Sequence, residues 1–127
     1  FVQYWQDILA LTILGQKIRT QTPIHKVIVG HLDLIKIIAL FEGNPTLDAT
    51  AGFEPIIEKI LKNIKTFSLT LEYNPAGMRK GIGAYPDPAL FEKAKAMGIP
   101  LSFGSDAHSA NDYPYFDIQT LPKELYS

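Results

Sequence analysis

The chain has 127 residues, a formal net charge of -1 and no cysteine, which is enough for one domain and excludes disulfides, thiolate metal sites and cysteine nucleophiles. Hydrophobic residues make up 46% of it and charged residues 20%, a composition typical of a globular protein rather than a disordered one. The small net charge provides no basic field for nucleic acid or an anionic membrane surface, and charged residues interrupt the apolar stretches before they reach membrane-spanning length. We therefore expect neither partner, and the lack of cysteine fits a reducing, cytoplasmic location.

The first half of the chain predicts a helix, a strand, a loop and a second helix. Apolar residues on one helical stripe predict an amphipathic helix over residues 1–17, which stops before Pro23. Residues 25–30 are β-branched without clean alternation, which is typical of a short strand buried on both faces. Glycine, asparagine and proline predict a loop within residues 41–50. Apolar residues at helical spacing over residues 53–64 predict the second helix, with a proline in its first turn.

The second half predicts a strand, a helix and another strand. Residues 67–73 alternate between apolar and polar, which indicates a strand that ends at Asn74. After a loop, Asp87 and the proline that follows it predict a helix start, and Gly98 predicts its end. Residues 99–103 form an apolar run that predicts a third, buried strand, whereas the tail from residue 111 has no period. The whole chain therefore predicts one α/β domain over residues 1–127, with parallel β-strands joined by helical crossovers.

Polar side chains follow each predicted strand at its carboxyl end. In parallel α/β folds these ends lie along one rim, where functional residues gather. Imidazole and carboxylate groups at such a rim suit zinc, manganese or iron. The residues concerned are His31 and Asp33 after the first strand, Glu72 and Asn74 at the second, and Asp106 and His108 after the third.

Each of these residues also has a structural interpretation. An Asp-x-His pattern by itself can be a turn followed by a solvated histidine. His31 could be a hydrogen-bonded structural histidine, and Asp33 could be a cap or an acceptor behind a ligand. Glu72 could pair with a lysine, and Asn74 before a proline is a natural turn residue. His25 precedes its strand and thus lies at the opposite rim, where we assign it no chemistry.

Three blocks of the sequence carry a resemblance. They are Gly30-His31-Leu32-Asp33-Leu34-Ile35-Lys36, Leu71-Glu72-Tyr73-Asn74-Pro75-Ala76-Gly77-Met78-Arg79-Lys80, and Gly98-Ile99-Pro100 leading to Gly104-Ser105-Asp106-Ala107-His108. In this order they resemble the polymerase-and-histidinol-phosphatase (PHP) superfamily, and its histidinol-phosphatase branch most closely. The resemblance covers about Val27 to Tyr113. It implies a distorted (βα)7 TIM-like barrel with a metal centre at the carboxyl rim, of which this chain would be the carboxyl-terminal half.

The resemblance also implies residue roles. His31, Asp106 and His108 would be metal ligands and catalytic residues in a centre of up to three divalent ions (Zn, Mn or Fe) in the complete enzyme. Arg79 and Lys36 would hold the substrate phosphate, as their charge permits, and Asn74 is a further candidate at the substrate. The family's opening His-x-His motif and its other amino-terminal ligands are absent from this sequence, so the chain would need the missing amino-terminal half of the same domain as its partner.

These features lead to the hypothesis of a metal-dependent phosphomonoesterase, which converts histidinol phosphate to histidinol and phosphate in histidine biosynthesis. The small-molecule substrate could instead belong to another PHP-type phosphoesterase, and the chain could also be a polymerase-associated PHP domain. A non-catalytic α/β binding or scaffold protein is the alternative from a different class. We expect little activity from the chain alone, and exposed apolar surface at its first and last strands.

Overall fold

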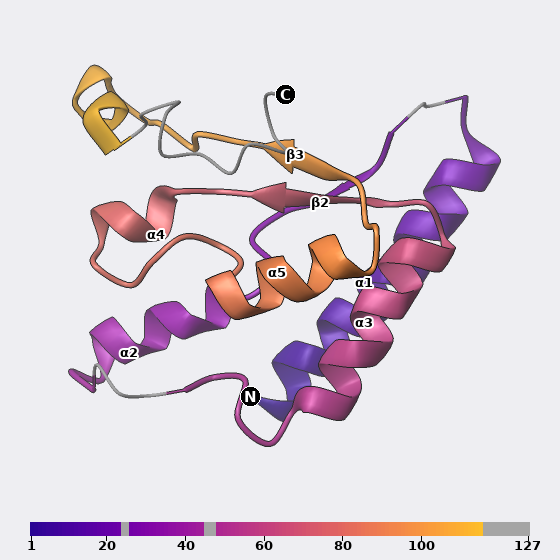
Figure 1. The fold of residues 1–127 in the computed structure, drawn as a ribbon, viewed down its shortest axis with the longest axis horizontal. Helices are drawn as coiled ribbons and strands as arrows, with labels where there is room; N and C mark the ends of the chain where they lie inside the picture. Colours follow the sequence, from indigo (N-terminus) through magenta and orange to yellow (C-terminus); the bar gives the residue numbers. More distant parts are fainter. Residues whose placement is uncertain (24–25, 45–47, 116–127) are drawn as a thin grey trace.

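The computed structural model describes residues 1–23, 26–44 and 48–115. Helices and strands alternate along the chain, with short helical turns between them (Figure 1). In chain order the elements are α1 (Val2–Gln21), β1 (Ile28–Val29), the 3-10 turn η1 (Leu34–Ile37), α2 (Ile38–Phe41), α3 (Glu54–Thr66), β2 (Thr70–Tyr73), α4 (Ala76–Arg79), α5 (Pro88–Ala96), β3 (Leu101–Phe103) and the 3-10 turn η2 (Ala110–Tyr115).

The three strands form one parallel sheet in the order β1-β2-β3. Val29 is paired with Leu71 on β2, and Leu71 is paired with Leu101 on β3. Figure 1 shows α5 below β2, with α1 and α3 packed together on the right of the sheet. The parallel sheet and its helical crossovers confirm the predicted α/β class. The described residues form an open sheet of three strands rather than a closed barrel.

The core lies between the sheet and the amphipathic helix α3. The predicted stripe of α3 is buried, with Ile60, Leu61 and Ile64 fully inaccessible to solvent. Each such side chain contributes about 1.5–3 kcal/mol relative to its exposed state. Trp5 of α1 packs into the same cluster, and its indole Nε1 donates a hydrogen bond to the Ala49 carbonyl at 2.9 Å. This bond ties the first helix to the segment that leads into α3.

The helix ends lie close to their sequence signals, but Asp87 does not cap α5 with its side chain. α1 ends at Gln21, two residues before Pro23, and α5 begins at Pro88 directly after Asp87. Gly98 follows α5 with a φ of 74°, a left-handed conformation that glycine adopts without steric cost. The Asp87 side chain makes no capping hydrogen bond, because its carboxylate is paired with Lys36 instead.

Three local features differ from the predictions. The first strand was expected to be buried on both faces, but Ile28 is 48% exposed because β1 pairs along one edge only in the described sheet. The third strand is partly rather than fully buried over residues 101–103. The loop predicted after Asn74 contains the single helical turn α4, which is too short to show a hydrophobic period.

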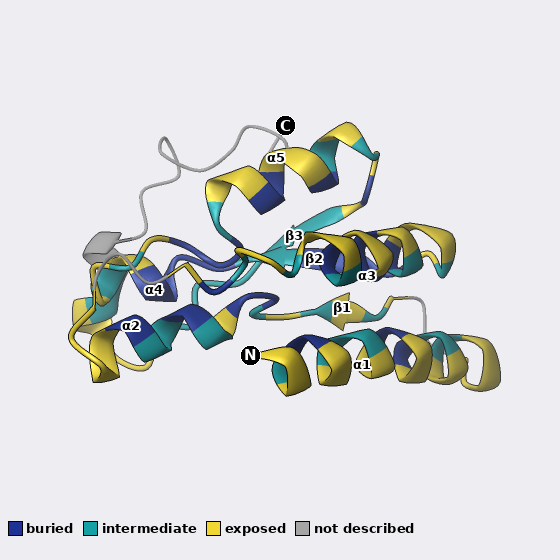
Figure 2. Cartoon of the chain, turned by 90° about the horizontal axis from the view of Figure 1, so that it is seen from below, coloured by how far each residue is buried: buried dark blue, intermediate teal, exposed yellow. Residues whose placement is uncertain are grey.

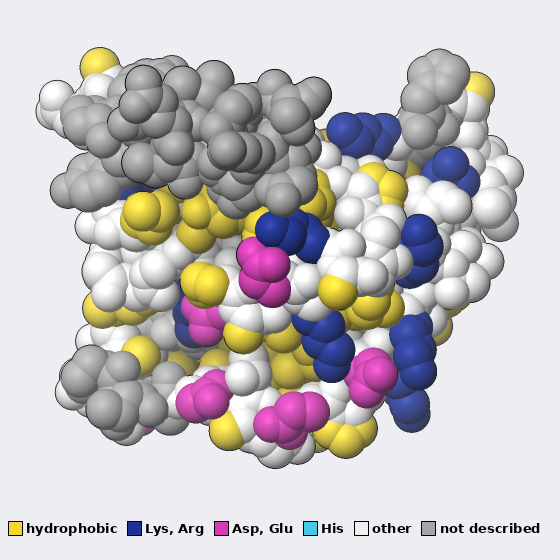
Figure 3. Space-filling model, in the orientation of Figure 1, with side chains coloured by type: hydrophobic (Ala, Val, Ile, Leu, Met, Phe, Trp, Pro, Cys, Tyr) yellow, Lys and Arg dark blue, Asp and Glu magenta, His cyan; other side chains and the backbone are white. Residues whose placement is uncertain are grey.

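Apolar side chains remain exposed on α1. Leu11 and Leu14 are 53% and 49% exposed, and Figure 2 shows the exposed outer side of this helix in yellow. No helix within residues 1–23, 26–44 and 48–115 combines the length and apolar character that crossing a membrane requires. On the face shown in Figure 3, acidic and basic side chains both occur among apolar ones, in keeping with the small net charge.

Candidate metal centre

His31 and Asp106 meet at the carboxyl ends of the strands. His31 follows β1 and Asp106 follows β3, yet the His31 Nε2 lies 3.1 Å from the Asp106 Oδ2. Both side chains are 34% exposed, so the contact is open to solvent. The parallel sheet brings these strand ends to one edge, which places the two residues together across 75 positions of sequence. Their roles as ligands remain predictions.

The backbone at both residues is held in an unusual conformation. His31 has a φ of 48° and Asp106 a φ of 51°, in the left-handed region that non-glycine residues seldom occupy. Such a residue costs about 1–3 kcal/mol and persists only where its surroundings hold it. The Glu72 carboxylate accepts a hydrogen bond from the His31 backbone N–H at 3.2 Å. Arg79 donates to the backbone carbonyls of Ser105 and Asp106 at 3.1 and 2.7 Å.

Asn74 fixes the polarity of the contacts around the His31 ring. The Asn74 Oδ1 accepts a hydrogen bond from the Ala76 backbone N–H at 2.8 Å, so its Nδ2 is the atom that faces the ring. That Nδ2 lies 3.1 Å from the His31 Nε2 and 3.3 Å from the Glu72 Oε2. An amide donor beside Nε2 favours a lone pair on that nitrogen. Asn74, predicted at the substrate, therefore contacts the predicted ligand His31.

The donor set around His31 and Asp106 fits a cation. With a lone pair on Nε2, the imidazole and the Asp106 carboxylate oxygen face each other as two acceptors at 3.1 Å. Two acceptors at hydrogen-bonding distance repel unless a proton or a cation lies with them. Neutral imidazole and carboxylate are the ligands that zinc and related ions take in proteins. The pair thus brings together two of the residue types that the predicted metal site requires, and its role as a metal site stays a prediction.

His108 is not joined to the pair. Its side chain is 80% exposed, its Nδ1 lies 2.8 Å from the Asp106 backbone oxygen, and the same Nδ1 is 4.0 Å from the Asp106 Oδ1. Within the part of the chain that the structure describes, no group of three or more histidine, aspartate or glutamate side chains could hold a metal ion. The three predicted ligands thus do not surround one point, and their place at separate ions of a multi-metal centre stays a prediction.

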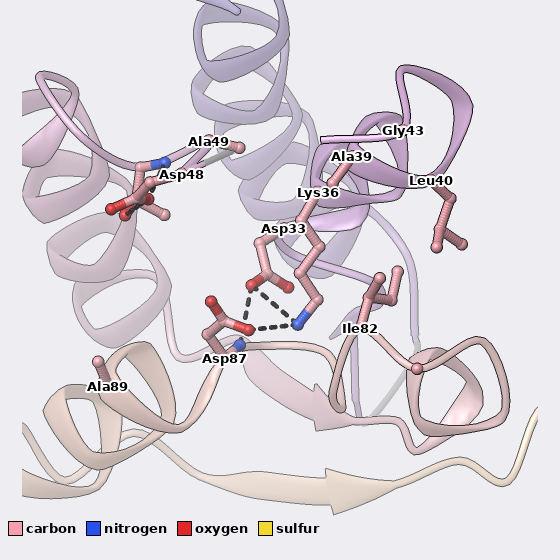
Figure 4. Close-up of a pocket in the computed structure, with 12 residues that line it drawn as sticks. Asp33, Lys36, Ala39, Leu40, Gly43, Asp48, Ala49, Ile82, Asp87 and Ala89 are labelled. Carbon is pink, nitrogen blue, oxygen red and sulfur yellow. Dashed lines mark hydrogen bonds and ion pairs between the residues drawn. The ribbon is translucent and has the colours of Figure 1, made fainter. Parts of the chain in front are cut away.

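Lys36 lies in a second charged cluster, apart from Arg79. Its Nζ donates to the Asp87 Oδ1 at 2.5 Å and to the Ala84 carbonyl, and lies 3.6 Å from the Asp33 Oδ2. The three charged side chains line a pocket of about 640 Å³ and converge there in Figure 4. Lys36 is only 8% exposed. It could reach a phosphate only by leaving both carboxylates.

Asp33 is the buried member of this second cluster. Its Oδ2 accepts a hydrogen bond from the Asp87 backbone N–H at 2.8 Å, which agrees with its interpretation as an acceptor rather than a ligand. Burial raises the pKa of the Asp33 carboxyl, and the Lys36 charge opposes that rise. Asp87 was read from the sequence only as a helix cap, because its pairing with Lys36 joins residues 51 positions apart.

Tyr85 lies near both clusters; the sequence placed it before a helix, where Tyr85-Pro86 fits the family pattern, but gave it no role at the site. The centroids of the Tyr85 and His31 rings lie 5.7 Å apart. The Lys36 Nζ lies 4.8 Å from the Tyr85 ring centroid. Burial, followed by the charges of Asp33 and Asp106, raises the pKa of the Tyr85 hydroxyl. Its backbone pairs with Asn74 in both directions at 2.7 Å. No local pattern predicts this pairing, which depends on the loop between α4 and α5.

The fold and the site describe an α/β protein with a polar cluster at the carboxyl edge of a parallel sheet. Comparison with known proteins shows that the chain is 34% identical over 90 residues to a histidinol-phosphatase of Bacillus subtilis (strain 168). The aligned segment is 68% of this chain and 32% of that protein. No family model matches the chain. A search of solved structures gave no significant match.

The chain is therefore related to the histidinol-phosphatase branch of the PHP superfamily, which confirms the resemblance seen in its sequence blocks. It spans about a third of the length of the curated relative that it matches. The name of that relative applies to the whole protein, of which the aligned segment is 32%. An activity for the present chain is therefore a proposal.

Proposed function

We propose that the chain contributes part of the active site of a metal-dependent phosphomonoesterase, with histidinol phosphate as the substrate. The observation that carries the proposal is the His31–Asp106 contact at 3.1 Å, made by residues from two of the sequence blocks that resemble the family. The similarity to a histidinol-phosphatase supports a phosphatase over a polymerase-associated domain. The acceptor pair described above supports a cation site over a purely structural cluster.

The chain's own residues would divide the work by position. His31 Nε2 and an Asp106 carboxylate oxygen would hold a divalent ion, and His108 would join another part of the centre. Bound divalent ions would supply Lewis-acid polarisation of the phosphoryl group and a hydroxide nucleophile. Arg79 would fix the substrate phosphate by charge-assisted hydrogen bonds from the guanidinium donors that its contacts with the Ser105 and Asp106 carbonyls leave free. Asn74 would orient the imidazole, and Lys36 would act at the phosphate only after release from its two carboxylates.

The proposal requires ligands beyond those of this chain. Two close donors cannot hold a three-metal centre, and the family's amino-terminal ligands are absent from the sequence. We propose that the amino-terminal part of the same barrel supplies them and that the chain alone has little phosphatase activity. A rate near that of a complete phosphatase from the purified 127-residue chain would contradict this dependence.

A chimera tests the function directly. The chain would replace the aligned segment of the Bacillus subtilis histidinol-phosphatase, and hydrolysis of histidinol phosphate would be measured with Zn²⁺ and Mn²⁺. We expect metal-dependent activity that Asp106→Asn abolishes and that Glu58→Gln, an exposed control on α3, leaves unchanged. A folded, metal-loaded chimera without activity would contradict the proposed function.

A further inference from the structure

Glu72 is a carboxylate held at the centre of the strand ends. It lies on the middle strand β2, between β1 and β3, and its side chain is 18% exposed. A Cβ added at Gly104 would overlap the Glu72 Oε1, and one added at Gly30 would lie 3.0 Å from the Oε2. The carboxylate therefore occupies space that is free because Gly30 and Gly104 lack side chains. Gly30 directly precedes His31, and Gly104 is two residues before Asp106.

The Glu72 Oε2 lies beside His31 and its neighbour Asn74. Its Oε2 accepts the His31 backbone N–H at 3.2 Å and the Asn74 Nδ2 at 3.3 Å. The same oxygen lies 3.8 Å from the His31 Nδ1, longer than a hydrogen bond but within the range of a charge interaction. A carboxylate on that side of the ring favours a proton on Nδ1. The Asn74 amide on the other side favours a lone pair on Nε2.

The competing influence comes from Asp106. Its Oδ2 lies 3.1 Å from Nε2 and would draw the ring proton to that nitrogen in the absence of other groups. Only a neutral imidazole with its proton on Nδ1 presents Nε2 toward Asp106 as a metal ligand. Metal-binding histidines usually have such a carboxylate or carbonyl partner on the second nitrogen, which fixes the tautomer and the ring orientation.

We propose that Glu72 is a positioning residue, which sets the His31 tautomer with the proton on Nδ1 and so directs the Nε2 lone pair toward Asp106. The benefit of this tautomer for metal binding rests on the proposed function. The tautomer itself is a property of the metal-free chain. Glu72 acts through His31 and needs no contact with a metal or a substrate. Its effect on the proton position can therefore be measured without any enzymatic assay.

The test uses the full chain, labelled with ¹⁵N, at a pH about two units above the ordinary imidazole pKa. Long-range ¹H–¹⁵N spectra distinguish Nδ1–H from Nε2–H, and His31→Asn identifies the resonances. We expect Nδ1–H in the wild type and a shift toward Nε2–H in Glu72→Gln. Glu58→Gln is the matched control, because that carboxylate on α3 is half exposed and pairs only loosely with Lys62 at 3.8 Å.

A second variant keeps the Glu72 charge but displaces the carboxylate from its position. Gly104→Ala adds a Cβ that overlaps the Glu72 carboxylate, so it should displace Glu72 and shift the tautomer in the same direction. A wild-type chain with its proton on Nε2 overturns the inference whatever the variants do. An unchanged Nδ1–H tautomer in a folded Glu72→Gln chain overturns it as well.

Zinc titration separates this inference from the proposed function. In the chimera described above, we expect Glu72→Gln to weaken Zn²⁺ binding about 10-fold or more, the usual effect of losing a partner behind a metal-binding histidine. A chimera that binds neither Zn²⁺ nor Mn²⁺, together with the tautomer shift in the chain, contradicts the proposed metal site and supports the positioning role. Equal zinc affinity of the wild type and of Glu72→Gln, together with an unshifted tautomer, contradicts the positioning role alone.

Discussion

Two charged clusters lie near the Tyr85 ring, and they differ in whether they contain their own cation. The first cluster has the carboxylates of Glu72 and Asp106 around a partly exposed imidazole. The second has the carboxylates of Asp33 and Asp87 around the ammonium group of Lys36. Lys36 is nearly buried, whereas His31 and Asp106 are about one-third exposed.

Under the proposed function, the second cluster stabilises the fold and the first binds a ligand. In the second cluster the charges neutralise one another inside the protein, so no ligand is needed. In the first cluster the Arg79 guanidinium contacts backbone carbonyls of Ser105 and Asp106 and lies 3.7 Å from Asp112. The His31 imidazole and the Asp106 carboxylate have no such ammonium partner among the described residues. If the Nε2 lone pair faces Asp106 as proposed, an added cation would complete the first cluster, whereas removal of its cation would disrupt the second.

The largest expected effect is on metal binding by the first cluster. In the chimera with the Bacillus subtilis protein, Asp106→Ala should lower the affinity for Zn²⁺ by more than about 100-fold, because loss of a direct ligand exceeds the loss of a partner behind one. Titration calorimetry measures this. Asp87→Asn is the control in the second cluster and should leave zinc affinity unchanged. An equal loss in both variants would show that the clusters do not differ as described.

The second prediction concerns stability and the second cluster. Lys36→Met leaves the buried Asp33 without its cation, which should lower the free energy of unfolding by about 3 kcal/mol, as for a broken buried ion pair. Urea unfolding followed by circular dichroism measures this. The matched control Lys62→Met removes an exposed pair with Glu58 and should change stability by less than about 0.5 kcal/mol.

A double variant tests the reason for that loss. Adding Asp33→Asn to Lys36→Met removes the uncompensated charge, so part of the lost stability should return. If Lys36→Met left stability unchanged but weakened phosphate binding to the chain, Lys36 would be a phosphate ligand, as first predicted from the sequence, and the contrast between the clusters would fail.

The smallest expected effect is the pH dependence that Asp33 contributes. Burial raises the pKa of Asp33 above its ordinary value of 3.8, so the folded state binds this proton more tightly than the unfolded state. The contribution to stability is full below 3.8 and is lost as the pH rises through the raised pKa. The stability difference between wild type and Asp33→Asn should therefore fall with rising pH in urea unfolding. A difference that rises with pH would show that attraction to Lys36 outweighs burial.

The sequence predicted the order of elements because those signals are local. The apolar period of α3, the proline that opens α5 and the glycine after it each act within a few residues. The same reasoning placed polar residues at three strand ends, and the parallel sheet brought His31 and Asp106 together as expected. It failed for β1, whose exposure depends on what lies beside it rather than on its β-branched residues.

The sequence by itself determined the α/β class, the positions of the strand ends and the relation to the histidinol-phosphatase branch. Only the tertiary structure separated the charged residues into two clusters. It pairs Lys36 with Asp33 and with Asp87, which is 51 positions away in the sequence. It also places the Glu72 carboxylate against the backbone of His31, which has a left-handed conformation. Such pairings depend on the register of non-adjacent strands and on the path of the loops between them, which residue patterns along one segment do not encode.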